Sequence, residues 1–177
     1  DSGDIELVQD GNHGGNYPKS TEFVAEGIPL ITGACIENGR INLAKANHLT
    51  QERAKRLRVG FAKSGDVILS HKGTMGKTAI VPKLGTPHII LNPQLTLYRI
   101  NPRGRLKAAF LKYFFDSEIF QSHLVNISGT STINTLAVNQ QKRLEIPLPD
   151  VRTQEEIVDQ VSSLDDKIEL NRRMNAT

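Results

Sequence analysis

Residues 73–78 (GTMGKT) have the side-chain types of a phosphate-binding loop, in which backbone amides and a lysine hold a nucleotide. The complete motif needs a glycine five residues before the second one, and His71 occupies that position. It also needs a helix directly after the lysine. Residues 78–81 (TAIV) are instead typical of a strand, and Pro82 follows them. The two glycines are therefore expected to form a tight turn between strands.

Three further patterns approach a catalytic or metal site and fall short of it. Residues 91–94 (LNPQ) resemble part of the catalytic motif of adenine methyltransferases but lack its second proline and its stacking aromatic residue. Asp150, Glu155 and Glu156 could serve a metal-dependent nuclease, yet no lysine completes such a set. The five histidines have no ligand spacing, and Cys35 is the only cysteine. We therefore expect a chain that is not an enzyme, with no catalytic residue, cofactor or metal.

Charge is distributed unevenly along the 177 residues. Residues 1–152 hold 19 of the 22 Lys and Arg residues and 13 of the 19 Asp and Glu residues, for a net charge of +6, whereas residues 153–177 carry −3. A basic body favours a phosphate-bearing partner, and an acidic helix does not lie easily on DNA. The two parts are therefore expected to bind different partners.

Location follows from what the sequence lacks. No apolar run approaches the 18 residues of a membrane span, and no signal peptide is evident. A single cysteine rules out an internal disulfide. These features predict a cytoplasmic protein without membrane contact.

The order of apolar and turn residues predicts an α+β fold. We expect a twisted, mainly antiparallel mixed β-sheet with packed helices, followed by a coiled-coil-type C-terminal helix. Strands are expected at residues 4–9, 28–36, 65–70, 78–81, 88–91 and 95–100, and a short one ending at 146–149. Helices are expected at residues 50–58, capped by Thr50, at 105–125 with a break near Asp116 and Ser117, and in a short segment after 135. Asn38-Gly39 predicts a hairpin turn.

The last segment has the spacing of a helix that packs on another helix. Thr153 is the expected N-cap, and Ile157, Val161, Leu164 and Ile168 follow at intervals of 4, 3 and 4. This seam could fold back on its own domain or pair with a separate helix. The two prolines before the cap act as a stiff elbow and favour the separate partner. We accordingly expect a recognition domain at residues 1–150 and a helical spacer or dimerisation segment at 151–177.

Three polar loops, at residues 10–19, 71–77 and 128–135, could read DNA. Their amide, hydroxyl and imidazole groups suit base edges, and nearby lysines suit phosphate. Loops of this composition can also be merely solvated. The candidate DNA-binding residues are Asn12, His13, Asn16, Tyr17, Lys19, Lys72, Thr74 and Lys77, with Thr130, Ser131 and Asn134 as second choices.

Short segments with distinctive residues are spread over nearly the whole chain. They are residues 10–14 (DGNHG), 26–31 (EGIPLI), 39–41 (GRI), 65–70 (GDVILS), 72–77 (KGTMGK), Asn92 with Gln94, 129–131 (GTS), 146–149 (IPLP), 154–158 (QEEIV) and 164–171 (LDDKIELN). Each is weak alone. Their order and spacing resemble the target recognition domain of a type I restriction–modification specificity (S) subunit.

This resemblance implies a non-catalytic subunit that binds double-stranded DNA. Such subunits carry two recognition domains, each reading half of a split target, and two long helices that pair to set the spacing between the halves. The implied partners are methyltransferase (M) subunits, restriction (R) subunits in the full complex, and a second recognition half or a second copy bound through the C-terminal helix.

The chain also departs from the family pattern. The usual tryptophan-containing start is missing, only one recognition domain is present, and the helix stops at Thr177. These departures predict either a fragment or a half-subunit. Two alternatives remain open: the recognition part of a single-chain restriction–methylation enzyme, and an interaction domain with no role in DNA binding.

Overall fold

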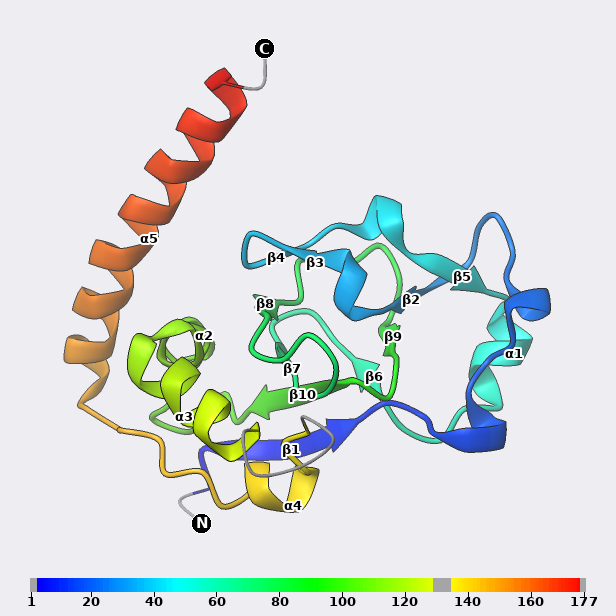
Figure 1. The fold of residues 1–177 in the computed structure, drawn as a ribbon, viewed down its shortest axis with the longest axis horizontal. Coiled ribbons are helices and arrows are strands. Elements are labelled where there is room, and N and C mark those ends of the chain that lie inside the picture. Colours follow the sequence, from blue (N-terminus) through cyan, green and yellow to red (C-terminus); the bar gives the residue numbers. More distant parts are fainter. Residues whose placement is uncertain (1–2, 129–134, 176–177) are drawn as a thin grey trace.

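The computed structural model describes residues 3–128 and 135–175, and the α+β fold class is confirmed (Figure 1). Within these residues the strands form two four-stranded sheets and one small hairpin. The first sheet has the order β1 (Ile5–Asp10), β10 (Leu95–Ile100), β7 (Val67–Ser70) and β8 (Thr78–Ile80), with every neighbouring pair antiparallel. The second has the order β5 (Asn47–Leu49), β2 (Ile28–Ile31), β9 (Ile89–Leu91) and β6 (Phe61–Ala62). Only β2 and β9 run parallel in this second sheet, so the combination is mixed but mainly antiparallel.

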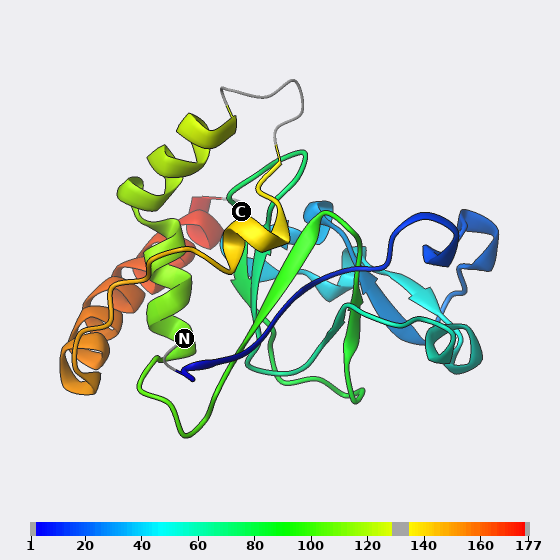
Figure 2. The ribbon, with the colours of Figure 1, turned by 90° about the horizontal axis from the view of Figure 1, so that it is seen from below.

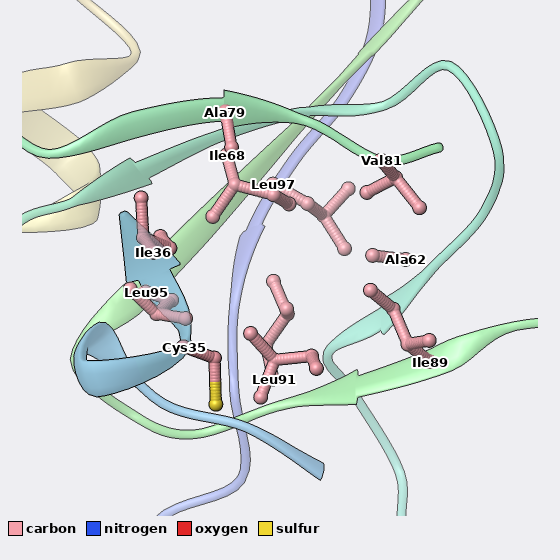
Figure 3. Close-up of a cluster of buried hydrophobic side chains, with 11 residues drawn as sticks. Cys35, Ile36, Ala62, Ile68, Ala79, Val81, Ile89, Leu91, Leu95 and Leu97 are labelled. Atoms are coloured by element: carbon pink, nitrogen blue, oxygen red, sulfur yellow. The ribbon is translucent and has the colours of Figure 1, made fainter. Parts of the chain in front are cut away.

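The two sheets enclose a fully apolar core. Ile31, Ile89 and Leu91 enter it from the second sheet, and Ile68 and Leu97 enter it from the first. Figure 3 shows side chains from both sheets pointing toward one another, with the sulfur of Cys35 among them. Burying these side chains drives the two sheets together.

Helices cover the opposite face of the first sheet (Figure 2). They are α2 (Ala108–Asp116) and α3 (Glu118–Ser128). Phe110, Phe115 and Phe120 pack there against strand residues such as Tyr98. The break between the helices falls at Ser117, as the sequence predicts, where the Ser117 hydroxyl donates to the Phe114 carbonyl at 2.7 Å.

Shorter elements form the rest of the described chain. Thr50 caps α1 (Gln51–Lys55) as expected, by accepting a hydrogen bond from the Arg53 amide. The hairpin of β3 (Ile36–Glu37) and β4 (Arg40–Ile41) turns at Asn38 and Gly39, which both have positive φ. The remaining helical turns are η1 (Gly14–Asn16), η2 (Ser20–Glu22), η3 (Gly33–Cys35), η4 (Leu43–Lys45) and α4 (Val138–Gln141).

Two strand predictions are wrong. The strand expected over 28–36 ends at Ile31, because η3 turns the chain before β3 begins. The strand expected to end at 146–149 does not form, and residues 144–150 have no regular structure. Pro147 and Pro149 have no amide proton to donate to a sheet, which explains the second difference.

The C-terminal helix α5 runs from Val151 to Asn175 and begins two residues before the expected cap. The carboxylate of Asp150 accepts hydrogen bonds from the Thr153 amide at 3.1 Å and from the Thr153 hydroxyl at 2.6 Å. These bonds lower the pKa of Asp150. Asp150 therefore caps the helix, and the prediction of Thr153 as N-cap is wrong. None of the helices in the described ranges is long and apolar enough to cross a membrane.

One face of α5 packs on its own domain. Gln154 is fully buried, donates to the carbonyls of Arg105 (3.1 Å) and Pro149 (2.8 Å), and accepts from the Lys107 amide (2.9 Å). Further along, the Asp165 carboxylate lies 3.4 Å from the Lys112 ammonium on α2. The two prolines before α5 therefore do not direct the whole helix away from the domain.

The predicted seam lies beside this packed face. Ile157, Leu164 and Ile168 are 38%, 56% and 48% exposed, and Val161 is half-buried. Val161 and Ile168 also line an open groove between α5, α2 and the β3–β4 hairpin. The helix thus packs on its own domain with one face and presents an apolar stripe with another.

Candidate nucleic-acid interface

Loops from distant parts of the sequence meet around His71, the residue that follows β7. Its amide donates to the Gln94 carbonyl at 2.9 Å, and its carbonyl accepts from the Leu136 amide at 3.0 Å. The next residue, Lys72, forms a β-bridge with Thr135. The 71–77 turn, the turn before β10 and the segment that starts at Thr135 therefore lie together (Figure 2).

The glycine-rich loop joins this cluster through β1. Asp10 pairs with Thr96 in the β1–β10 ladder, and the Thr96 hydroxyl lies 2.8 Å from Nδ1 of His71. The exposed ring of His13 lies beside the Asp10 carboxylate, with Nε2 and Oδ2 2.5 Å apart. The start of the first predicted loop, at Asp10 and His13, thus lies close to His71, where the second begins.

A buried chain of hydrogen bonds supports the cluster from below. The Tyr98 hydroxyl donates to Oε1 of Gln141 at 2.6 Å. The Gln141 amide donates to the Thr96 hydroxyl at 3.0 Å and to the Leu136 carbonyl at 2.8 Å. The Thr96 hydroxyl completes the chain at His71. Because all four side chains are buried, removing one partner would leave another polar group buried without a hydrogen bond.

Burial affects the protonation of His71, which lies at the end of this chain. Thr96 Oγ1 accepts from the Gln141 amide and shares a second hydrogen bond with Nδ1 of His71, in which either atom can donate. Burial lowers the pKa of His71. The carboxylate of Asp10 acts to raise this pKa, and the charges of His13 and Lys72 act to lower it. The fold therefore favours the neutral form of this imidazole.

The 71–77 turn is held by its own backbone and by Lys77. Ser70 Oγ donates to the Thr74 carbonyl at 2.7 Å and accepts from the Lys77 amide at 2.8 Å. The Lys77 ammonium donates to the carbonyls of Gly33 (2.9 Å) and Ile36 (3.1 Å). Lys77 thus ties the turn to η3, while Lys72 and Thr74 are exposed. Strand β8 follows the turn, so the helix that a nucleotide-binding loop needs is replaced by a strand.

Residues of the first loop divide into anchors and exposed groups. Asn12 is 2% exposed, donates to the Val59 carbonyl at 2.6 Å and accepts from the Arg58 amide at 3.0 Å. Tyr17 is half-buried against the cluster of β2, β5 and α1, and this burial raises the pKa of its hydroxyl. His13, Asn16 and Lys19 are exposed. The structure therefore places Asn12 and Tyr17 in the support of the loop.

The third predicted loop is described only at its ends. Thr130, Ser131 and Asn134 lie outside the described residues. Among the residues that are described, no group of histidine, cysteine, aspartate and glutamate side chains could hold a metal ion.

Sequence reasoning missed the supporting residues His71, Thr96 and Gln141. Thr96 offered one signal, because it is a polar residue within the otherwise mainly apolar strand Leu95–Ile100. Polar residues inside buried strands usually have a specific hydrogen-bond partner. The identity of that partner depends on the fold and could not be read from spacing.

The family model and the curated relatives that match this chain all belong to type I restriction–modification specificity proteins. Residues 6–177 match the family model described as "Type I restriction modification DNA specificity domain". The chain is 27% identical over 169 residues to the type I restriction enzyme MjaIX specificity subunit of Methanocaldococcus jannaschii, covering 92% of this chain and 37% of that protein. It is 26% identical over 142 residues to the type I restriction enzyme EcoBI specificity subunit of Escherichia coli, covering 80% and 29%. The chain thus spans about a third of the length of these relatives.

Solved structures show the same fold. The HsdS subunit from Thermoanaerobacter tengcongensis matches with a TM-score of 0.67 and 16% identity, over 97% of this chain and 37% of that one. The type I restriction–modification S subunit from M. genitalium matches with a TM-score of 0.60 and 16% identity, over 96% and 41%. At this level of identity the likeness concerns the fold.

Proposed function

Because the chain belongs to the type I restriction–modification DNA specificity domain family, we propose that it reads one half of a split double-stranded DNA target for a restriction–modification complex. The observation that carries this proposal is the convergence of the polar loops around His71. Loops held at fixed positions can present donors and acceptors to base edges without first being ordered.

The exposed side chains of the cluster make the direct contacts in this proposal. His13, Asn16 and Thr74 offer groups suited to base edges, and Lys19 and Lys72 offer charge to phosphates. Asn12, Tyr17 and Lys77 act by holding the loops in place. Thr130, Ser131 and Asn134 remain candidates for base reading from the third loop.

The protein partners follow from the same proposal. Methyltransferase and restriction subunits supply the chemistry, and this chain directs them without a catalytic residue of its own. The apolar stripe of α5 is proposed to pair with the helix of a second recognition half or of a second copy. Its exposure supports this role, because contiguous apolar side chains on a helix favour helix pairing.

Methylome sequencing of cells that carry the intact complex tests the function directly. Deleting this gene is expected to abolish methylation of one split motif and to leave other modified motifs unchanged. A methylome that keeps every motif after deletion would contradict the proposal. The motif that disappears also supplies the DNA duplex for the binding experiments described below.

A second experiment tests the assignment of the 71–77 turn. Replacing Thr74 with Ala in the intact complex is expected to relax the sequence preference at one position of the half-site. Replacing Thr86 with Ala, in the β8–β9 connection outside the three polar loops, is the control. It removes a hydroxyl that donates to the His88 carbonyl and should leave the motif unaltered. An unchanged motif in the Thr74 variant would remove this residue from the reading surface.

A further inference from the structure

Three exposed cations lie on and just after α1, outside the three loops already considered. Lys55, Arg56 and Arg58 are all exposed, and we call them the basic strip. No ion pair is recorded for them within the described residues. Arg53 on the same helix differs, because its guanidinium contacts the Glu22 carboxylate at 2.5 Å. The strip therefore carries charge that is not neutralised inside the molecule.

The backbone of the basic strip is joined directly to the glycine-rich loop. The Asn12 side chain accepts from the amides of Arg58 and Val59 and donates to the Val59 carbonyl. The Gln9 side chain accepts from the Gly60 amide at 3.0 Å. These bonds fix the end of the strip against the residues immediately before His13.

Close backbone contacts at Gly11 and Gly60 also hold the basic strip against the glycine-rich loop. A Cβ on Gly60, which has a φ of +75°, would lie 2.8 Å from Cα of Gly11. A Cβ on Gly11 would lie 2.1 Å from the Leu91 carbonyl oxygen. The two chain segments meet at a distance that only glycine allows at both positions. Arg53 adds a second link from α1, since it donates to the Asn16 carbonyl at 3.3 Å.

Charge around the strip favours an anionic partner. The acidic groups near it are few: Glu52 is exposed in the first turn of α1, Glu26 is exposed in the loop that packs beside Leu49, and Glu22 is paired with Arg53. Asp10, farther along, is paired with His13. Lys19 adds one more exposed cation in the adjoining loop. A solvated helix face of an ordinary domain usually mixes both signs, whereas the exposed cations of these segments outnumber the exposed unpaired carboxylates Glu26 and Glu52.

We propose that the basic strip is a second DNA-binding element that grips phosphates flanking the bases read by the loops. This inference rests on the proposed function. Arginine suits the role because its planar group can hold a phosphate with two hydrogen bonds. Contacts to phosphate position the protein on the duplex and carry no sequence information. Because the junction at Asn12 is rigid, the basic strip and the loops that read bases move as one unit.

The test measures the salt dependence of DNA binding. The full chain, assembled with its methyltransferase subunits, binds a duplex that carries the split motif found by methylome sequencing. Each phosphate contact contributes about 0.9 to the slope of log affinity against log salt concentration. Replacing both Arg56 and Arg58 with Gln is therefore expected to reduce that slope by about 2 and to weaken binding at low salt. Preference for the motif over a scrambled duplex should be unchanged.

Matched controls separate this effect from a general loss of charge. Replacing Lys83 and Arg103 with Gln removes the same charge from exposed sites outside the strip. The salt slope of this control should equal that of the parent protein. If the double arginine variant folds poorly, the single variants should each reduce the slope by about 1.

Each other outcome overturns a defined part of the proposal. A slope that is unchanged, or that falls equally in the control, removes the basic strip from the DNA interface while the proposed function stands. Loss of motif preference with an unchanged slope would show that the arginines read bases, which contradicts the phosphate assignment. Failure of the parent complex to bind the motif in a salt-sensitive way would overturn the proposed function together with this inference.

Discussion

At the scale of single residues, burial separates the side chains that hold the loops from those that face solvent. Asn12 and His13 are neighbours in the sequence, yet Asn12 is 2% exposed and His13 lies on the surface. Asparagine suits the buried position because one amide can both donate to and accept from a passing backbone. Composition indicated a polar loop, but the sequence could not show which of two adjacent polar residues turns inward.

Replacing Asn12 with Ala is expected to destabilise the fold by about 1–3 kcal/mol, because the backbone groups of Arg58 and Val59 lose the partner that the buried Asn12 side chain supplies. Urea unfolding of the two proteins measures the difference. The same change at exposed Asn126 is the control and should stay within about 0.5 kcal/mol. Equal stability of both variants would contradict the anchoring role of Asn12.

His71 predicts a pH dependence of stability. The pKa of His71 is lowered in the fold, chiefly by burial. As pH falls through the ordinary histidine range, the unfolded chain therefore binds a proton at His71 more readily than the folded chain does. Stability should be complete above that range and decline as pH falls through it. Unfolding at about pH 7.5 and about pH 5.5 should show a smaller loss in the His71→Gln variant than in the parent protein. The pKa of His88 is also lowered, but His88 is present in both proteins, so its contribution to the pH dependence cancels in the comparison. A loss of equal size would contradict the assignment to His71.

At the scale of elements, the hydrogen-bond chain from Tyr98 to His71 ties α4 and the 71–77 turn to β10. Strand β10 could be predicted from its alternating residues, and so could the helix break at Ser117. The two-residue strand β6 could not, because so short a segment leaves no periodic pattern. The link between elements was equally hidden, since it joins residues 25 to 45 positions apart.

Replacing Gln141 with Leu should loosen this link without unfolding the sheet. The Leu136 carbonyl and the Tyr98 hydroxyl would each lose their bond to the Gln141 side chain. Hydrogen exchange at the Leu136 amide, which donates to His71, is expected to accelerate more than exchange within β7. The exposed neighbour Asn139, changed to Leu, serves as control. Identical exchange in the two variants would argue against the link.

At the scale of the whole molecule, the basic strip and α5 occupy opposite sides of the sheets (Figure 1). The charge asymmetry along the sequence indicated a basic body and an acidic tail. In the fold the acidic helix contacts the body, at Asp165 and Lys112, but on the side away from the basic strip (Figure 1). The packing of Gln154 and Asp165 against the domain was not readable from the helix alone, because a heptad seam looks the same whichever surface it meets.

Replacing Leu164 with Asp should weaken association through α5 and leave the isolated chain as stable as before. Leu164 is 56% exposed, and burying such a side chain in a helix pair is worth about 1.5–3 kcal/mol. Sedimentation of the full chain should therefore show at least about a tenfold loss of affinity for a second recognition half or a second copy. Ser163→Asp introduces the same charge at the adjacent exposed position and is the control. Undiminished assembly of the Leu164 variant would exclude the stripe from the contact.

The glycine contact beneath the first loop has a consequence for how such a protein can evolve. Gly11 and Gly60 meet the neighbouring backbone so closely that nearly any substitution there would disturb the junction. His13, Asn16 and Thr74 are exposed and carry none of that constraint. Mutation can therefore exchange the surface residues one by one while the framework beneath them persists. Under the proposed function, a lineage built on this scaffold is free to explore new recognition sequences without having to acquire a new fold.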